Sequence, residues 1–173
     1  MHILRDWMYR IPAIRLAEAR PVVLLLMVTL GASLTYGITG PVLPLFVQQM
    51  AAESGRLAST TGTIVGVGAF TAAVAALALG RAGGRLDHGR ILPACCAGTA
   101  ICYLPMALAR SPWTLGLANA LQGFFRGGIG PFVSVALVER TAPERVGTTL
   151  GLNSSLASAG FAIGPLIGAW LMN

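Results

Sequence analysis

The feature that most constrains this chain is a series of long apolar runs, separated by short connections that hold nearly all of its charge. A helix needs about 20 mostly apolar residues to cross about 30 Å of hydrocarbon, and the runs reach that length. Apolar residues make up 55% of the chain and charged residues only 10%, whereas about a quarter of a soluble domain is charged. The sequence therefore predicts an all-α, polytopic transmembrane helical bundle.

Five spans are predicted within one transmembrane domain over residues 21–173. They cover about residues 21–47, 61–79, 91–109, 113–138 and 147–172. Residues 1–20 precede this domain and bring Leu4, Trp7, Met8 and Ile11 together at helical spacing. That spacing favours a short amphipathic helix in the headgroup region on the cytoplasmic side, with a flexible tail as the alternative.

The arginines between the runs predict how the domain is oriented. Every basic residue is an arginine, and short loops rich in arginine stay on the cytoplasmic side. The side that holds the N-terminal tail collects nine arginines, whereas the opposite side holds only Arg56 and Arg110. We therefore expect a cytoplasmic N-terminus, an external C-terminus and a location in a bacterial-type inner (plasma) membrane, with the lipid bilayer as the surrounding partner.

One charge, Arg126, lies deep inside a predicted span. Such a charge costs about 2.5 to 3.5 kcal/mol on insertion scales and is tolerated mainly where it faces a bundle interior or a wet cavity. Asn119, Gln122 and Arg126 follow the spacing i, i+3, i+7, which places them in one polar stripe. Two interpretations stay open: a cavity lining where Arg126 meets an anionic or polar solute, or an arginine bonded to carbonyls freed near residues 127–131.

Two further patterns mark helix faces that meet other helices. Thr29, Ser33, Tyr36 and Gly40 form a weaker stripe on the first span; packing is its favoured explanation, with Tyr36 as a further candidate for the cavity. Small residues spaced by four let helix backbones approach closely in lipid. That spacing predicts packing faces at Gly160, Gly164 and Gly168 with Pro165 between them, and at the shorter pairs Gly62 with Gly66 and Gly123 with Gly127.

Several kinds of chemistry lack the residues that they need. No Asp or Glu falls inside a predicted span, so the chain offers no obvious proton carrier. Cys95, Cys96 and Cys102 share one apolar run without a CxxC pair or a nearby His, which favours apolar packing over a metal or redox site. No reactive side chain is paired with a base, and the arginines form no basic face with interleaved aromatics. We expect no enzyme, no cofactor, no metal and no nucleic-acid partner.

Three segments, in order, resemble the major facilitator superfamily of secondary transporters. The first is GRAGGRLDHGRIL at residues 80–92, which lies without gaps on the family's cytoplasmic motif. Gly80, Arg85, Arg90 and Leu92 match that motif, while Gly84 stands where the family usually has Asp and Asp87 where it has Gly. The resemblance implies a cytoplasmic gating turn that comprises Gly80, Arg81, Gly84, Arg85, Asp87 and Arg90.

The other two segments are similar to the family's helix motifs. ALQGFFRGGIGP at residues 120–131 resembles its fourth or tenth helix through the pair Gln122 and Gly123, although the arginine often found four residues before that glycine is Asn119 here. GFAIGPLIGA at residues 160–169 is close to the glycine pattern of antiporter-type members. Gly160, Gly164, Pro165 and Gly168 match it, and Ala169 replaces the last glycine.

The resemblance implies transport of a small molecule by alternating access, of an efflux or antiporter-like type. The C-terminal half, helices seven to eleven, is the favoured match, and the N-terminal half is the other choice. Because the family builds its cavity between two six-helix halves, the five predicted spans imply a missing helix and a missing half. A second half-transporter or a second copy would supply that half. The alternative is a truncated product or helical scaffold without transport activity.

Overall fold

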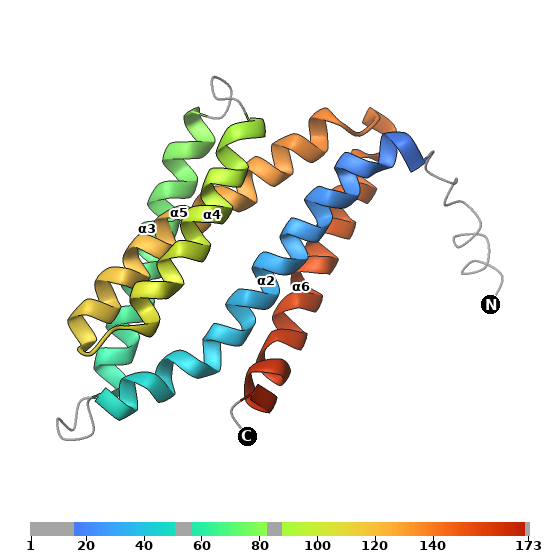
Figure 1. Ribbon diagram of the computed structural model, residues 1–173. Coiled ribbons are helices and arrows are strands. Elements are labelled where there is room, and N and C mark those ends of the chain that lie inside the picture. Colours follow the sequence, from blue (N-terminus) through green and yellow to red (C-terminus); the bar gives the residue numbers. More distant parts are fainter. Residues whose placement is uncertain (1–15, 51–56, 83–87, 172–173) are drawn as a thin grey trace.

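The computed structural model describes residues 16–50, 57–82 and 88–171, and within these ranges the chain is helical and contains no strand (Figure 1). The long helices are α2 (Leu16–Met50), α3 (Leu57–Ala82), α4 (His88–Ala107), α5 (Pro112–Glu139) and α6 (Val146–Leu171), and a short 3-10 turn, η2 (Pro143–Arg145), leads into α6. All five long helices are apolar and long enough to cross a membrane. The prediction of an all-α bundle with five spans is confirmed.

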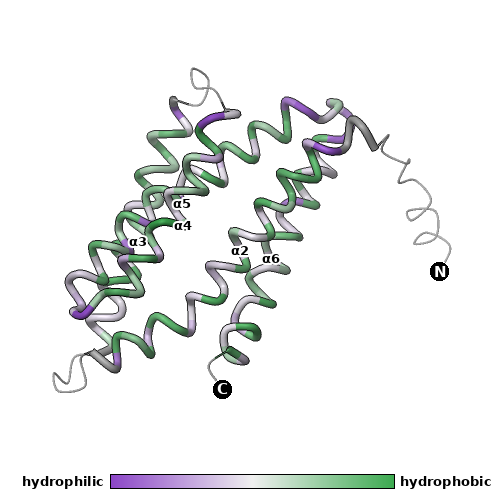
Figure 2. The backbone as a smooth tube through the Cα atoms, in the orientation of Figure 1, coloured by the Kyte–Doolittle hydropathy of each residue, from purple (hydrophilic) through white to green (hydrophobic). Residues whose placement is uncertain are grey.

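The helix ends follow from the local sequence. Ser111 caps α5, because its side chain accepts from the backbone N–H of Thr114 while Pro112 occupies the first turn. Hydrophilic residues gather towards the ends of the helices and hydrophobic ones along their length (Figure 2). Helix α2 begins at Leu16, so the last part of the predicted amphipathic segment already belongs to it. Residues 1–15, which hold the rest of that segment, lie outside the described residues.

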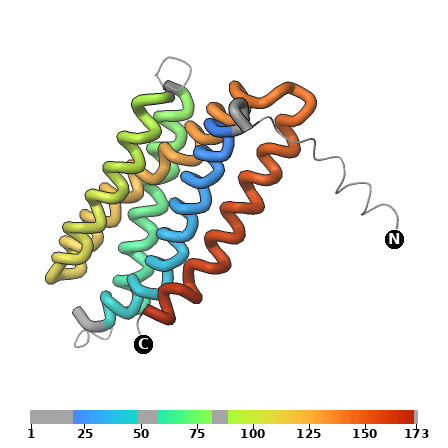
Figure 3. Tube along the Cα trace, turned by 45° about the vertical axis from the view of Figure 1, so that its right-hand side comes forward, coloured from blue at the N-terminus to red at the C-terminus, as the bar shows by residue number. Residues whose placement is uncertain are grey.

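The helices form two groups. α5 packs along both α3 and α4, whereas α2 packs along α6 (Figures 1 and 3). Contacts between the groups, of α2 with α5 and α3 and of α5 with α6, are sparser. α2 contains Pro41 and Pro44, which remove backbone donors and can bend a helix. Beyond them its end turns towards the start of α3 (Figure 1).

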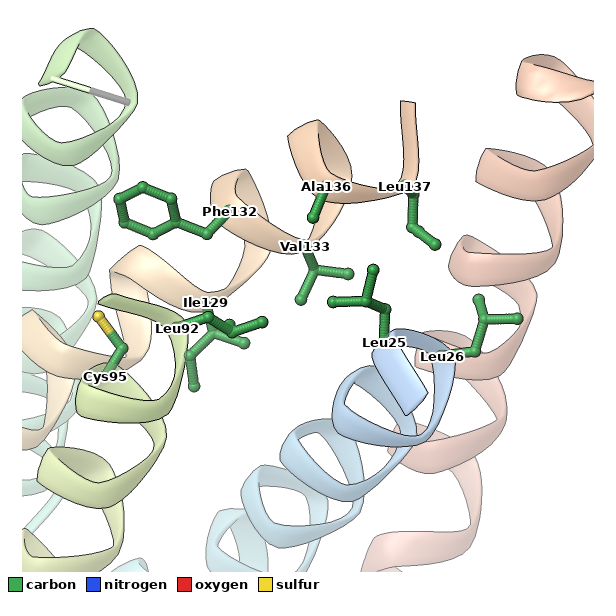
Figure 4. Packing of buried hydrophobic residues seen from close by; sticks show 9 residues of the cluster. All are labelled: Leu25, Leu26, Leu92, Cys95, Ile129, Phe132, Val133, Ala136 and Leu137. Carbon is green, nitrogen blue, oxygen red and sulfur yellow. The ribbon is translucent and has the colours of Figure 1, made fainter. Parts of the chain in front are cut away.

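Two apolar clusters join the groups at opposite ends. The first lies where α2, α4 and α5 meet, and Figure 4 shows Leu25 of α2 and Val133 of α5 pointing towards one another. Its buried members are Leu25, Leu26, Leu92, Cys95, Ile129, Phe132, Val133, Ala136 and Leu137. The second cluster comprises Leu43, Val47, Ile64, Met106, Ala109, Leu115 and Ala118. The polar stripe of α5 falls between the segments of that helix that enter the two clusters.

Glycines set the distance within each group. A Cβ added at Gly164 would lie 2.6 Å from the Cα of Gly37, and one at Gly160 would lie 2.7 Å from the Cβ of Ser33, so α2 and α6 touch through their backbones. A Cβ at Gly123 would likewise overlap the carbonyl oxygen of Gly68 on α3. Close contact of this kind replaces the hydrophobic force that is missing between helices in lipid.

On α3, the packing face that was predicted from the glycine spacing is wrong. Gly62 and Gly66 carry the same four-residue spacing, yet a Cβ at either position meets no atom within 4 Å in the described chain. This outer face of α3 has no neighbouring helix among the described residues. Spacing shows that a face can pack closely, but it does not show that a partner lies opposite.

Gly164→Ala should destabilise the bundle by about 1 to 3 kcal/mol, because the new methyl group meets the backbone of Gly37. Gly66→Ala is the matched control, since it gives α3 the same gain in helix propensity, up to about 1 kcal/mol, in open space. Unfolding of the purified chain in detergent, followed by circular dichroism, measures both changes. Equal stability of the two variants would show that the α2–α6 contact is looser than described.

Candidate functional site

A cavity lies between the two apolar clusters, where α2, α3 and α5 converge. Its empty volume is about 530 Å³, part of which opens to the outside. The lining residues are Tyr36, Thr39, Gly40 and Leu43 from α2, Val65, Gly68 and Ala69 from α3, and Asn119, Gln122 and Arg126 from α5. The structure thus brings the three residues of the predicted polar stripe and Tyr36 to one cavity.

Among the described residues that line the cavity, Arg126 is the only charged one. Its guanidinium carbon lies 4.0 Å from the centroid of the Tyr36 ring, in a cation–π contact between α5 and α2. Tyr36 is held in turn by Phe161 of α6, edge to face at 5.5 Å between ring centroids. The ring therefore covers one face of the guanidinium.

The hydrogen-bonding capacity of Arg126 is left incomplete. Its Nε is buried and has no hydrogen-bond partner among the described residues. Burying a charged donor without a partner is costly in an apolar medium. The second interpretation of Arg126, bonding to carbonyls freed near residues 127–131, finds no such bond at this nitrogen. Arg126 therefore lines the cavity while one of its donors, the buried Nε, has no partner in the described chain.

The side-chain amides of Asn119 and Gln122, unlike the Nε of Arg126, donate hydrogen bonds to neighbouring helices. The Nδ2 of Asn119 donates to the carbonyl oxygen of Ile64 on α3 at 2.8 Å. The Nε2 of Gln122, a residue only 3% exposed, donates to the hydroxyl of Tyr103 on α4 at 3.0 Å. Both side chains line the cavity and also fix α5 against its neighbours.

Tyr103 is a polar residue beside the cavity that the sequence did not indicate. Its hydroxyl oxygen accepts from Gln122 and, at 3.4 Å, from the hydroxyl of Thr39 on α2, so it links three helices beside the cavity. A tyrosine in a predicted span is a signal in itself, because a buried hydroxyl usually has a partner. The sequence could not show which helix supplies that partner.

The weaker stripe of α2 divides into two parts. The hydroxyl of Thr29 donates to the Oδ1 of Asn153 on α6 at 2.7 Å, and buried Ser33 faces Gly160. These two residues serve helix packing, as the sequence favoured. Tyr36 and Gly40 instead line the cavity, so packing does not account for the whole stripe.

The predicted gating turn is described only at its edges. Gly80 and Arg81 lie in the last part of α3, and Arg90 lies in the first turn of α4. Gly84, Arg85 and Asp87 lie outside the described residues. The end of α3 and the start of α4 lie at the end of the bundle away from the second apolar cluster (Figure 1).

Replacing Tyr103 by Phe should cost about 1 to 3 kcal/mol of stability, because the buried amide of Gln122 loses its acceptor. Adding Gln122→Met should recover most of that loss, since both partners are then apolar. A double-mutant cycle of unfolding free energies in detergent measures the coupling. Additive effects would mean that the Gln122–Tyr103 hydrogen bond contributes nothing to stability.

Comparison with known proteins adds to this geometry. The model of the family described as Major Facilitator Superfamily matches residues 21–173. "Multidrug resistance protein MdtG" of Escherichia fergusonii is 30% identical over 154 residues, which are 89% of this chain and 38% of the relative. The protein of the same name from Enterobacter lignolyticus is 31% identical over 154 residues, 89% of this chain and 37% of the relative. The chain spans less than two fifths of the length of these curated relatives.

Proposed function

Because this chain belongs to the Major Facilitator Superfamily, we propose that its helices form one side of the solute pathway of a secondary transporter. The role is transport of a small molecule rather than enzymatic catalysis. The cavity formed by Tyr36, Asn119, Gln122 and Arg126 is the solute-contact site in this proposal.

The observation that carries the proposal is the incomplete hydrogen bonding of Arg126. Asn119 and Gln122 have partners on α3 and α4, whereas the buried Nε of Arg126 has none among the described residues. Charged groups inside a membrane domain mark substrate or ion pathways more often than packing contacts. A guanidinium with unused donors at the middle of α5 therefore fits a binding group for a passing solute.

The pathway is completed by a second half in this proposal. Family members enclose their site between two halves, and this chain corresponds to less than two fifths of its relatives' length. We place the chain as a C-terminal half, resembling helices seven to eleven. A complementary half closes the other side of the pathway in this proposal, and the turn from Gly80 to Arg90 acts as the cytoplasmic gate.

The names of the relatives indicate the kind of solute and the membrane. They are called multidrug resistance proteins and come from enteric bacteria. Export of drug-like molecules across a bacterial inner membrane, with the N-terminus in the cytoplasm, is the corresponding role for this chain. The count of nine arginines in the N-terminal tail and the connections on one side, against two on the other, supports that orientation.

Drug sensitivity of a bacterial strain that lacks its main efflux pumps tests the proposal. Expression of the chain should raise tolerance to at least one compound in a panel of anionic, neutral and cationic drugs. Arg126→Gln should remove that tolerance, whereas Arg110→Gln, which removes the same charge from an exposed connection, should keep it. Equal membrane levels of the variants are checked by immunoblot.

Two results would contradict the proposal. Tolerance that survives Arg126→Gln would separate transport from the cavity. No tolerance to any compound, with the chain present in the membrane, would favour a truncated or scaffold protein without transport activity of its own.

A further inference from the structure

Building on the transport role proposed above, we infer that the solute is an amphipathic anion. Its carboxylate, or a similar oxyanion, pairs with Arg126, and its apolar body occupies a second cavity that adjoins the first. The inference rests on three features of the described residues: the free edge of one guanidinium, the absence of a carboxylate in the cavity lining, and the shared wall of the two cavities.

The guanidinium of Arg126 is presented edge-on to a ligand. The Tyr36 ring covers one of its faces at 4.0 Å, so the N–H groups in the guanidinium plane remain as the contact surface. This planar fork matches a carboxylate or phosphonate in a two-bond arrangement. The Nε is buried without a partner in the described chain, so the first contact with a ligand falls to the two terminal nitrogens.

The charge of the ligand follows from what surrounds Arg126. No Asp or Glu is among the residues that line the cavity, so the described chain supplies no counter-charge there. A cationic solute would meet repulsion from Arg126 in a medium that screens it weakly. An anion would instead neutralise the buried charge and satisfy its donors.

The second cavity is apolar and has an empty volume of about 810 Å³. It shares Thr39 and Leu43 with the first cavity and extends along α2 towards Phe46. Met106 of α4 and Leu115 of α5 form its other walls. The hydroxyls of its two polar residues, Thr39 and Tyr103, are already joined to each other, so the space favours hydrocarbon or aromatic groups.

The spacing of the two cavities sets the length of the ligand. Arg126 and Leu115 are eleven positions apart on α5, which corresponds to about 16 Å along a helix. A small inorganic anion would occupy only the Arg126 end. A drug-sized acid with its charge at one end would fill both cavities, with its apolar part pointing away from the predicted cytoplasmic turn.

Binding of matched probes to the purified chain tests the inference. The chain is placed in nanodiscs of phosphatidylcholine, and equilibrium dialysis measures the Kd of 4-butylbenzoate, 4-butylbenzyl alcohol, 4-butylbenzylamine and benzoate, with empty nanodiscs subtracted. We expect 4-butylbenzoate to bind about 10- to 100-fold more tightly than the alcohol or the amine, the range for a hydrogen bond to a charged group. Benzoate, which lacks the butyl group, should bind more weakly.

Three variants assign each part of the probe to its cavity. Arg126→Gln should abolish the preference for the anion, whereas Arg110→Gln should preserve it. Val42→Trp, which fills the apolar cavity, should weaken 4-butylbenzoate and leave benzoate unchanged. Arg126→Lys keeps the charge without the planar fork and should retain part of the preference. Helix content and elution volume of each variant confirm that it is folded.

The outcomes that overturn the inference are distinct from those that overturn transport. Equal binding of the alcohol or the amine, or an anion preference that survives in folded Arg126→Gln, would refute the ligand class. Displacement of 4-butylbenzoate by 20% phosphatidylglycerol in the nanodisc would assign the site to a lipid headgroup and also refute it. Selective anion binding without drug tolerance in cells would uphold the ligand class and refute transport by this chain.

Discussion

Backbone contact between helices is the constraint on which the rest of this structure depends. Lipid offers no hydrophobic force to bring helices together, so close van der Waals contact has to do so. Gly164 against Gly37 brings α6 to α2, and Gly123 against Gly68 brings α5 to α3. Each of the two helices α2 and α5 is thereby fixed against a neighbouring helix. The sparser contact between them leaves the space that forms the Arg126 cavity.

The chemical character of that cavity follows from which polar groups are satisfied. The amides of Asn119 and Gln122 are bound by Ile64 and Tyr103, so their orientation is fixed and their cost of burial is reduced. The guanidinium of Arg126 makes a cation–π contact with the Tyr36 ring, and its Nε has no hydrogen-bond partner among the described residues. One stripe thus contains two amides that are bound by neighbouring helices and one guanidinium whose buried Nε has no partner among the described residues.

Hydropathy and helical period were enough to predict the five spans and the polar stripe, because both depend on local sequence. The choice of neighbours was not predictable from spacing. Gly62 and Gly66 resemble Gly160 and Gly164 in pattern but face open space. Tyr103 was overlooked for the same reason, since its partners Gln122 and Thr39 come from other helices. Where two helices meet depends on the tertiary arrangement of the whole bundle.

The segment around Gln122 shows how packing and binding are encoded together. Gln122 and Arg126 are each followed directly by a glycine, Gly123 and Gly127, that allows the backbone of α3 to lie against α5. The approach of α3 brings the carbonyl of Ile64 within reach of Asn119. The same approach places Gly68 and Ala69 in the cavity wall. A larger residue at either glycine would therefore move α3 and reshape the cavity without touching a polar side chain.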